Sequence, residues 1–348
     1  MINNMPSILE KNFSTLGKIE YKIASTPKEM EDALSLVYRE YVKHRLIDPN
    51  EYKSPIRIGI NHILPEKSTI FIGRKDQEVI ITFSTFHDSP LGLPIEAGYQ
   101  KETQFLRDQG RKIGEGGCLA VESSLFKNKR TSRAYIEKIH FIFTILRMAI
   151  HHNLYYTDID DAVMVTNPHP KRKMLKHFPI EPIGEIKNYG FDEVDVNPKA
   201  AIAERFDFRM LRKAMKNPLE LFNYKKALFF LTFGGDIPKT VFNQKLHLTV
   251  KDLHYFFVQK SNILLSLKPH ELNYVLSSYG LNHDDYKKLI SNQLENNLSK
   301  TSRTNASRSI SNEKMDHRHA PLRPQYPTAA GNHASPVSLL KAPSDPHH

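Results

Sequence analysis

One glutamate flanked by glycines is the clearest chemical feature of this sequence. Glu115 lies in the run Arg111–Glu122, which reads Arg-Lys-Ile-Gly-Glu-Gly-Gly-Cys-Leu-Ala-Val-Glu and is typical of a central strand. Interior glycines in a strand mark a bulge or a close approach by another backbone or a ligand. Because strand side chains alternate, Glu115 is expected to share a face with Leu119 and Val121 unless a bulge intervenes. Cys118 is then expected on the other face.

A carboxylate among apolar side chains must be paired, hydrated or used in chemistry. For Glu115 a solvated glutamate at the end of a strand is the competing interpretation. Four basic residues form a second candidate site, because they surround the start of a long predicted helix, where amide N–H groups and the helix dipole favour an anion. These residues are Lys127, Lys129, Arg130 and Arg133. A solvated basic surface is the alternative for them.

Several catalytic signatures are missing from the sequence. It has no G-x-S-x-G elbow, no H-E-x-x-H pair, no Walker A loop and no G-x-G-x-x-G. Its single cysteine excludes an internal disulfide, and no spacing of Cys and His residues suggests zinc, so no metal site is expected. A reducing, cytoplasmic location is the expectation, supported by the lack of a long apolar run and of a signal peptide in the first 25 residues.

The chain is basic, with 49 Lys and Arg against 38 Asp and Glu among 348 residues and a net charge of +11. The segment 296–348 holds seven Lys or Arg and three Asp or Glu, so +7 remains for the rest. A basic body favours acidic partners, such as nucleic acid, a membrane surface, a nucleotide cofactor or an acidic carrier protein. Charge alone does not choose among them.

Hydrophobic periodicity predicts the elements that must hold Glu115 in place. Strands are predicted at 19–24, 68–73, 78–87, 111–122, 161–166, 181–189 and 200–208, and helices at about 27–44, 95–110, 131–153 and 168–177. In the long helix, Ile136, Phe143 and Ile150 are expected to face the sheet and Arg147 the solvent. The long irregular connection at 45–67 is of a kind that often carries a site. This order predicts an α+β fold of three α/β/α layers around a mixed sheet.

The C-terminal third has a different character. Residues 1–18 carry no periodic signal and are predicted to be a flexible lead, and the sheet domain is predicted to span 19–208. Helix caps at Thr249 with Asp252, at Pro269 with Glu271 and at Asn282 predict an all-helical appendage over 209–295. The remainder, 296–348, has few large apolar residues and is predicted to be a disordered tail.

Three stretches together resemble the FeeM-type N-acyl amino acid synthases. They are Phe71–Glu96, which ends in Asp-Ser-Pro-Leu-Gly-Leu-Pro-Ile-Glu, then Arg107–Val121, and then Glu181-Pro-Ile-Gly-Glu-Ile. The resemblance covers about residues 19–208. That family belongs with the GNAT-fold acyltransferases and is similar to the autoinducer (acyl-homoserine lactone) synthases. The resemblance implies a GNAT-like fold and transfer of a long-chain fatty acyl group from an acyl carrier protein to the amine of an amino acid or similar small amine.

The resemblance also implies roles for individual residues. Glu115 matches the strand glutamate of the family, and a desolvated glutamate there can take the amine proton while strand amides hold the oxyanion. Arg39 matches an arginine of the first-helix pattern and is expected to bind the acceptor, whereas the preceding arginine position holds Val37. The acyl chain or the pantetheine arm is expected to bind at Phe71, Phe83, Leu119, Ala120, Val121 and Val165, for which packing in the core is the alternative.

The donor and the partners follow from the same comparison. GNAT enzymes normally have a glycine loop for the pyrophosphate of coenzyme A, and Phe126–Arg133 contains no glycine. We therefore expect no bound cofactor, an acyl carrier protein as donor and partner through Lys127, Lys129, Arg130 and Arg133, and acyl-coenzyme A as a poorer donor. No nucleic-acid partner is expected, and peripheral membrane contact is left open. The alternative functions are a noncatalytic module that binds acyl groups or carrier proteins, and an acyl-homoserine-lactone-synthase-like enzyme.

Overall fold

The structure is a computed structural model that describes residues 19–126, 132–168, 180–189, 199–217 and 237–291. The predicted flexible lead, the predicted disordered tail and nearly all of the basic helix predicted at 168–177 lie outside these residues. Three of the four residues of the first basic cluster, Lys127, Lys129 and Arg130, lie outside them as well. Arg133 belongs to a described helix, but its side chain is not described.

Residues of high β propensity build one mixed sheet, ordered β1-β2-β3-β4-β5-β8-β6, with β7 paired to β8. The strands are β1 (Glu20–Ile23), β2 (Ser68–Lys75), β3 (Glu78–His87), β4 (Ile113–Val121), β5 (Asp161–Thr166), β6 (Ile180–Pro182), β7 (Lys187–Tyr189) and β8 (Lys199–Asp207). Among the described strands, β4 and β5 form the one parallel pair. The strand predicted at 181–189 is thus two short strands that pair at successive places along β8.

Helix α2 (Pro27–Lys43) begins where its sequence signals predict. The Thr26 hydroxyl accepts a hydrogen bond from the Glu29 N–H at 3.2 Å, and Pro27 occupies the first turn. The remaining helices of the sheet domain are α3 (Glu96–Asp108), α4 (Ser132–Tyr155) and α5 (Phe208–Lys216). The hairpin β2–β3 also forms as its pattern predicts.

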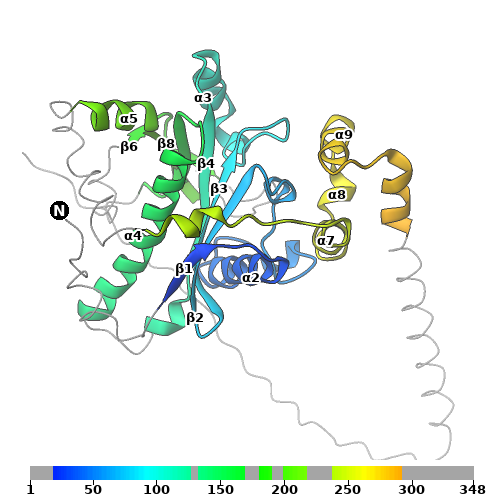
Figure 1. Ribbon diagram of the computed structural model, residues 1–348, viewed down its shortest axis with the longest axis horizontal. Helices are drawn as coiled ribbons and strands as arrows, with labels where there is room; N and C mark the ends of the chain where they lie inside the picture. The colour runs from blue at the N-terminus through cyan, green and yellow to red at the C-terminus, as the bar shows by residue number, and fades with distance from the viewer. Residues whose placement is uncertain (1–18, 127–131, 169–179, 190–198, 218–236, 292–348) are drawn as a thin grey trace, which may run out of the picture. The chain divides into compact units, whose positions relative to one another are not determined.

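Two helices cover opposite faces of the sheet (Figure 1). Met30 and Leu34 of α2 pack in one buried apolar cluster with Ile70 and Ile72 of β2. On the other face, α4 buries Phe141, Ile145 and Met148 against Phe71 and Ile81 in a second cluster. The predicted α+β class, with three α/β/α layers around a mixed sheet, is confirmed.

The orientation predicted for α4 is wrong at two residues. Ile136, expected to face the sheet, is 47% exposed, whereas Arg147, expected in solvent, is only 6% exposed. Phe143 and Ile150 pack as predicted: they are partly buried against a third apolar cluster that includes Phe206 of β8.

A neighbouring stripe of α4, through Phe141 and Ile145, meets β2 and β3. Both stripes therefore contact the sheet, which periodicity alone did not show.

A bulge in β4 decides which side chains lie beside Glu115. Between Thr82 and Ser84 on β3 there is one residue, whereas between their partners Ala120 and Gly117 there are two. The extra residue is Cys118, whose φ of +53° is the left-handed value that a bulge requires. The alternation of side chains between the two faces of β4 is therefore shifted by one residue from Cys118 onward.

The expected grouping of side chains along β4 is consequently wrong. Cys118 and Ala120 join the apolar cluster on the α2 face, together with Ile113, while Leu119 and Val121 turn to the α4 face. Glu115 thus shares its face with Cys118 and not with Leu119 or Val121.

The glycines of β4 allow close contacts, as interior strand glycines usually do. A Cβ atom added to Gly114 would lie 2.9 Å from the backbone oxygen of Phe86. A Cβ atom added to Gly116 would lie 2.8 Å from Cζ of Phe83. Both distances are shorter than packed atoms tolerate, so a side chain at Gly114 would push β3 and β4 apart, and one at Gly116 would displace the Phe83 ring.

Strands β4 and β5 separate just beyond Glu115. Their parallel ladder pairs Ile113 with Asp161, Gly114 with Ala162 and Glu115 with Val163, and it ends there. From Gly116 onward, the edge of β4 that faces β5 has no ladder partner among the described residues. Backbone groups along that edge are therefore available to a ligand.

The described part of the C-terminal segment, 237–291, contacts both faces of the sheet: Phe242 packs in the apolar cluster on the α4 face, whereas the helices from Val250 onward pack on the α2 face. It contains α7 (Val250–His254), a π-helical turn (Tyr255–Gln259), α8 (Ile263–Ser266), α9 (Pro269–Ser278) and helical residues 283–291. The Thr249–Asp252 capping box forms as predicted. All described residues belong to one unit that ends at Leu294.

Candidate acyltransferase site

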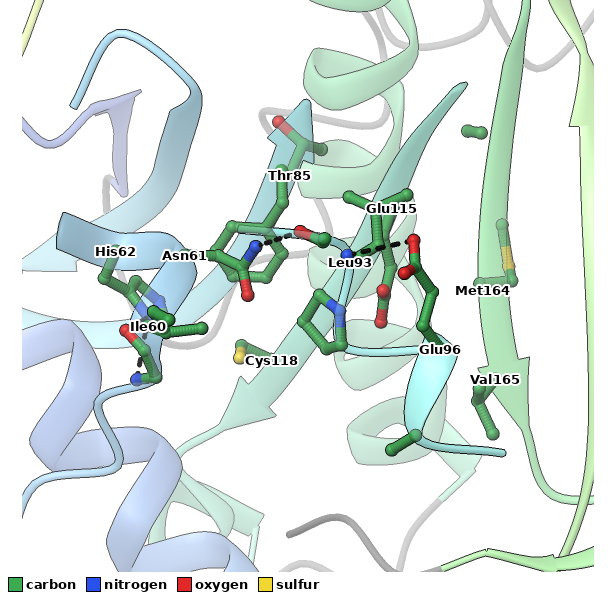
Figure 2. Close-up of a pocket in the computed structure, with 18 of the residues that line it drawn as sticks. Ile60, Asn61, His62, Thr85, Leu93, Glu96, Glu115, Cys118, Met164 and Val165 are labelled. Carbon is green, nitrogen blue, oxygen red and sulfur yellow. Dashed lines mark hydrogen bonds between the residues drawn. The ribbon is translucent and has the colours of Figure 1, made fainter. Parts of the chain in front are cut away.

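A cavity of about 910 Å³ surrounds the place where β4 and β5 separate. Side chains from both faces of the sheet line it: Glu115 and Cys118 from the α2 face, and Leu119 and Leu146 from the α4 face. The cavity therefore passes through the gap in the sheet. In Figure 2, Glu115 lies between the loop residues Asn61 and His62 on one side and β5 on the other.

Glu115 is buried in the middle of this cavity, with 6% of its surface exposed. The Ile95 N–H donates a hydrogen bond to Glu115 Oε2 at 2.6 Å. Burial raises the pKa of Glu115 to about 8; the charge of Glu96 adds to this effect, whereas the Ile95 hydrogen bond and the Arg57 guanidinium oppose it. A carboxyl group with a pKa close to neutral pH is suited to exchange a proton with a substrate.

The connection between α2 and β2 supplies a polar wall opposite Glu115. Arg57, Asn61 and His62 line the cavity from this segment. The Arg57 guanidinium donates a hydrogen bond to Cys118 Sγ at 3.2 Å and lies 5.2 Å from the centre of the Tyr41 ring. These contacts hold one positive charge close to Glu115.

His62 adds a buried ring nitrogen to this wall. It is 2% exposed, and burial together with the Arg57 charge lowers its pKa to about 3, so the ring is neutral. Nδ1 lies 3.1 Å from the Gly59 N–H, which can donate to it, and 3.3 Å from the Gly59 carbonyl oxygen, to which Nδ1–H can donate, so these contacts are compatible with both tautomers. Nε2 has no hydrogen-bond partner within the described part of the chain. Such an orphaned buried nitrogen is costly unless a ligand or water pairs with it.

The half of the cavity on the α4 face is largely apolar. Phe83, Leu119, Leu146, Ala149, Ile150 and Met164 line it. Thr85 is the polar exception on β3: it is 4% exposed, and its hydroxyl has no partner among the described residues. Asn153 of α4 also lines the cavity, and its Oδ1 has no partner among the described residues. This half can therefore take an alkyl chain, with the Thr85 hydroxyl and the Asn153 amide oxygen left to bind polar groups.

Comparison with known proteins explains this arrangement. Residues 32–196 match the family model described as N-acyl amino acid synthase FeeM. Over residues 32–196 the chain is thus similar to this family. The match confirms the resemblance drawn from the sequence and, with the mixed sheet covered on both faces, the GNAT-like fold. The match supports N-acyl transfer as the type of reaction.

Solved structures show likenesses of low identity. FeeM from uncultured soil microbes is 19% identical over 57% of this chain and 96% of its own, with a TM-score of 0.43. The acyl-homoserine lactone synthase LasI is 12% identical over 55% and 89%, with a TM-score of 0.38. The CoA-dependent acyl-homoserine lactone synthase BjaI is 11% identical over 59% and 89%, with a TM-score of 0.35. No curated protein sequence matches the chain significantly.

Four of the residues predicted for the FeeM-type site line the cavity, namely Glu115, Phe83, Leu119 and Val165. Phe71, Ala120 and Val121 do not line it and are buried in the two apolar clusters, where alternation and the bulge direct them. Arg39 does not line it either. Its side chain is 54% exposed and pairs with Glu122 at 3.1 Å. The roles assigned to these residues stay predictions.

Sequence reasoning missed the polar wall of the cavity. It identified the segment 45–67 as an irregular connection that could carry a site, but it named none of Arg57, Asn61 and His62. A single cation in an irregular segment has no periodic signal, and only the packing of this segment on β4 reveals its role.

Neither a metal site nor a membrane span is evident in the described residues. They contain no group of three or more His, Cys, Asp or Glu side chains arranged to hold a metal ion. None of their helices combines the length and the apolar character needed to cross a bilayer.

Proposed function

We propose that the chain transfers a long-chain fatty acyl group from an acyl carrier protein thioester to the amine of an amino acid or a similar small amine. One observation carries the proposal: Glu115 is buried, with a pKa of about 8, at the place where the cavity passes through the sheet. An acceptor on the α2 face and a donor on the α4 face would meet at this residue.

The chemistry needs one base and one oxyanion site. Glu115 takes a proton from the acceptor amine, whose nitrogen attacks the thioester carbonyl. The new C–N bond forms as the C–S bond breaks, and the proton held by Glu115 returns to the departing thiolate. N–H groups on the unpaired edge of β4 beyond Glu115 are placed to stabilise the oxyanion.

The polar wall supports an acceptor with a carboxylate. Arg57 and His62, whose Nε2 has no partner among the described residues, both line the half of the cavity on the α2 face. A guanidinium binds a carboxylate strongly, and the neutral imidazole supplies a second donor in the tautomer that carries its proton on Nε2. An amino acid would place its carboxylate at this wall and its amine at Glu115.

Replacing Arg57 with methionine tests this arrangement. We expect the KM for an amino acid to rise roughly tenfold to a hundredfold, since a charge-assisted hydrogen bond is lost, and the KM for the donor to stay unchanged. Isoamylamine is leucine without its carboxylate. Its KM should hardly change in the variant. Initial rates with both acceptors measure the effect.

Arg39→Met is the matched control, because Arg39 is the acceptor residue that the family pattern suggests and it lies outside the cavity. We expect this variant to keep the preference for leucine over isoamylamine. Loss of that preference in Arg39→Met, with Arg57→Met unaffected, would transfer the role to Arg39.

The donor half supports a pantetheine thioester. A phosphopantetheine arm carries amide groups before its thioester, and Thr85 and Asn153 offer a hydroxyl and an amide oxygen in a largely apolar wall. Phe126–Arg133 has no glycine for a pyrophosphate loop, whereas Lys127, Lys129, Arg130 and Arg133 form a basic cluster in the sequence. Acyl carrier proteins present an acidic surface that such a cluster complements.

Donor choice gives a direct test of the proposed function. At matched concentrations, we expect a long-chain acyl carrier protein to be used much faster than the acyl-coenzyme A of the same chain, with N-acyl amino acid identified by mass spectrometry. The carrier-protein rate should fall steeply with salt, since opposite charges associate. Reversing Arg130 and Arg133 to Glu should raise the donor KM and leave the acceptor KM unchanged. Equal, salt-insensitive use of acyl-coenzyme A would refute the carrier-protein donor.

A further inference from the structure

We propose that the C-terminal helical segment 250–291 forms one wall of the acceptor half, which is the half of the cavity on the α2 face, and that Ile263 and Leu267 build a subsite there for an apolar amino-acid side chain. The inference rests on the proposed function and names the class of acceptor. It concerns residues outside the match to the FeeM family, which ends at residue 196. The selection of the acceptor would thus be a property that this chain adds to the domain.

Hydrogen bonds join the helical segment to the residues just before the polar wall. Lys53 Nζ donates to the backbone oxygen of Val258 at 2.7 Å and to Asn262 Oδ1 at 3.1 Å. The Ser54 hydroxyl donates to the backbone oxygen of Lys260 at 2.6 Å. Lys53 and Ser54 directly precede the part of the connection that carries Arg57.

Hydrogen bonds also join the helical segment to the residue that follows the polar wall. The Tyr279 hydroxyl donates to the backbone oxygen of Ile63 at 2.6 Å, next to His62. On α2, Glu31 Oε1 accepts from the Tyr255 hydroxyl at 2.8 Å and pairs with Lys260 at 3.1 Å. The helical segment therefore holds the connection on both sides of Arg57 and His62.

Apolar packing makes this attachment a stable one. Leu253, Phe256, Phe257, Val258 and Leu264 are fully buried and belong to the same apolar cluster as α2 and the α2 face of the sheet. Each large side chain buried in this way contributes about 1.5–3 kcal/mol. The segment is thus part of the core on that face, and its position beside the cavity is fixed by packing.

Five residues of the segment reach the cavity itself: Ile263, Ser266, Leu267, Lys268 and Glu271. Ile263 and Leu267 are partly buried and pack against the apolar cluster, so they present an apolar surface. The Lys268 side chain is 72% exposed and marks the rim, whereas the Glu271 carboxylate 3.9 Å away belongs to a side chain that is only 14% exposed. An acceptor bound by its carboxylate at Arg57 would direct its side chain to this apolar surface.

The test compares two leucines of one short stretch. Leu267 lines the cavity, whereas Leu265 is 44% exposed and does not. In the full-length enzyme with acyl carrier protein as donor, we expect the wild type to have a higher kcat/KM for leucine than for glycine, lysine or glutamate. Leu267→Ala should lower the ratio of kcat/KM for leucine to that for glycine roughly tenfold, because contacts with a few methyl and methylene groups are lost. Leu265→Ala should leave the ratio unchanged.

A second variant covers the case in which Leu267→Ala is poorly folded. Leu267→Phe fills the subsite, so it should lower the rate with leucine and spare the rate with glycine; melting temperatures of all variants are measured alongside. An unchanged leucine-to-glycine ratio in folded Leu267 variants, or a wild type that prefers lysine or glutamate, overturns the inference and leaves the proposed function standing. A wild type that acylates no amine from any thioester overturns both.

Discussion

Glu115→Gln is expected to lower turnover by roughly two to four powers of ten, because it removes the general base and keeps the shape of the side chain. The acceptor and donor KM values should change little. Steady-state rates with both substrates varied measure the effect. Glu78→Gln, an exposed carboxylate at the start of β3, is the control and should keep full activity. A Glu115→Gln enzyme with normal turnover would remove Glu115 from the catalytic step.

The pH dependence of the same variant separates a catalytic from a structural role. With a pKa of about 8, wild-type Glu115 is mostly protonated at pH 6, so kcat/KM should rise with pH and level off above about 8. The residual activity of Glu115→Gln should not show this rise.

The stability of the folded protein should depend on pH in the opposite sense to kcat/KM. The folded state keeps the Glu115 proton at pH values where the unfolded chain, with an ordinary value of 4.5, has released it. The contribution of Glu115 to stability therefore falls as pH rises from about 4.5 to about 8. Compared with wild type, Glu115→Gln should melt at a higher temperature at pH 9 and at a similar temperature at pH 4. A variant less stable at both pH values would indicate that Glu115 is needed for packing.

Asp161→Asn is expected to cause a large loss of stability, about 1.5–3 kcal/mol, because it removes buried charge-assisted hydrogen bonds; Arg111 then keeps one carboxylate partner, Asp207 at 2.8 Å. Asp161 is fully buried at the start of β5. Its Oδ1 accepts a hydrogen bond from Arg111 Nη2 at 2.8 Å, and its other oxygen pairs with Arg111 Nε. Arg205 lies 3.7 Å away. Thermal or urea unfolding measures the change.

This ion pair also holds together the short ladder that ends at the cavity, since Asp161 pairs with Ile113 in the register of β4 and β5. Asp158→Asn is the matched control: Asp158 pairs with Lys112 close by, but both side chains are largely exposed, so the loss should stay below about 1 kcal/mol. Equal stabilities of the Asp161 and Asp158 variants would contradict the assignment of a structural role to the buried pair.

Local chemistry in the sequence was enough to predict most elements and one site residue. The Thr26 cap with Pro27 fixes the start of α2, and the Thr249–Asp252 capping box fixes that of α7. These signals work because a side chain satisfies backbone N–H groups within one turn. Glu115 was found in the same way, since a charged residue between glycines in an apolar strand contradicts its surroundings.

The tertiary structure decided which face of a strand or helix is buried and which residues far apart in the sequence are in contact. The bulge at Cys118 depends on the register between β3 and β4, and it moves Leu119 away from Glu115. Helix α4 packs two apolar stripes on clusters that contain sheet residues, and this packing buries Arg147. Neither choice is encoded in a local pattern.

The acceptor half of the cavity shows most clearly what the sequence could indicate and what only the tertiary structure decided. The sequence indicated an irregular connection at 45–67 and an all-helical C-terminal segment, each by composition. That Arg57 and His62 face Glu115, and that Ile263 and Leu267 reach the same cavity, depends on contacts between residues more than 200 positions apart, such as Tyr279 with Ile63. Contacts of this kind follow from burial of apolar area across the whole chain, so the sequence determined the parts and the packing determined the site.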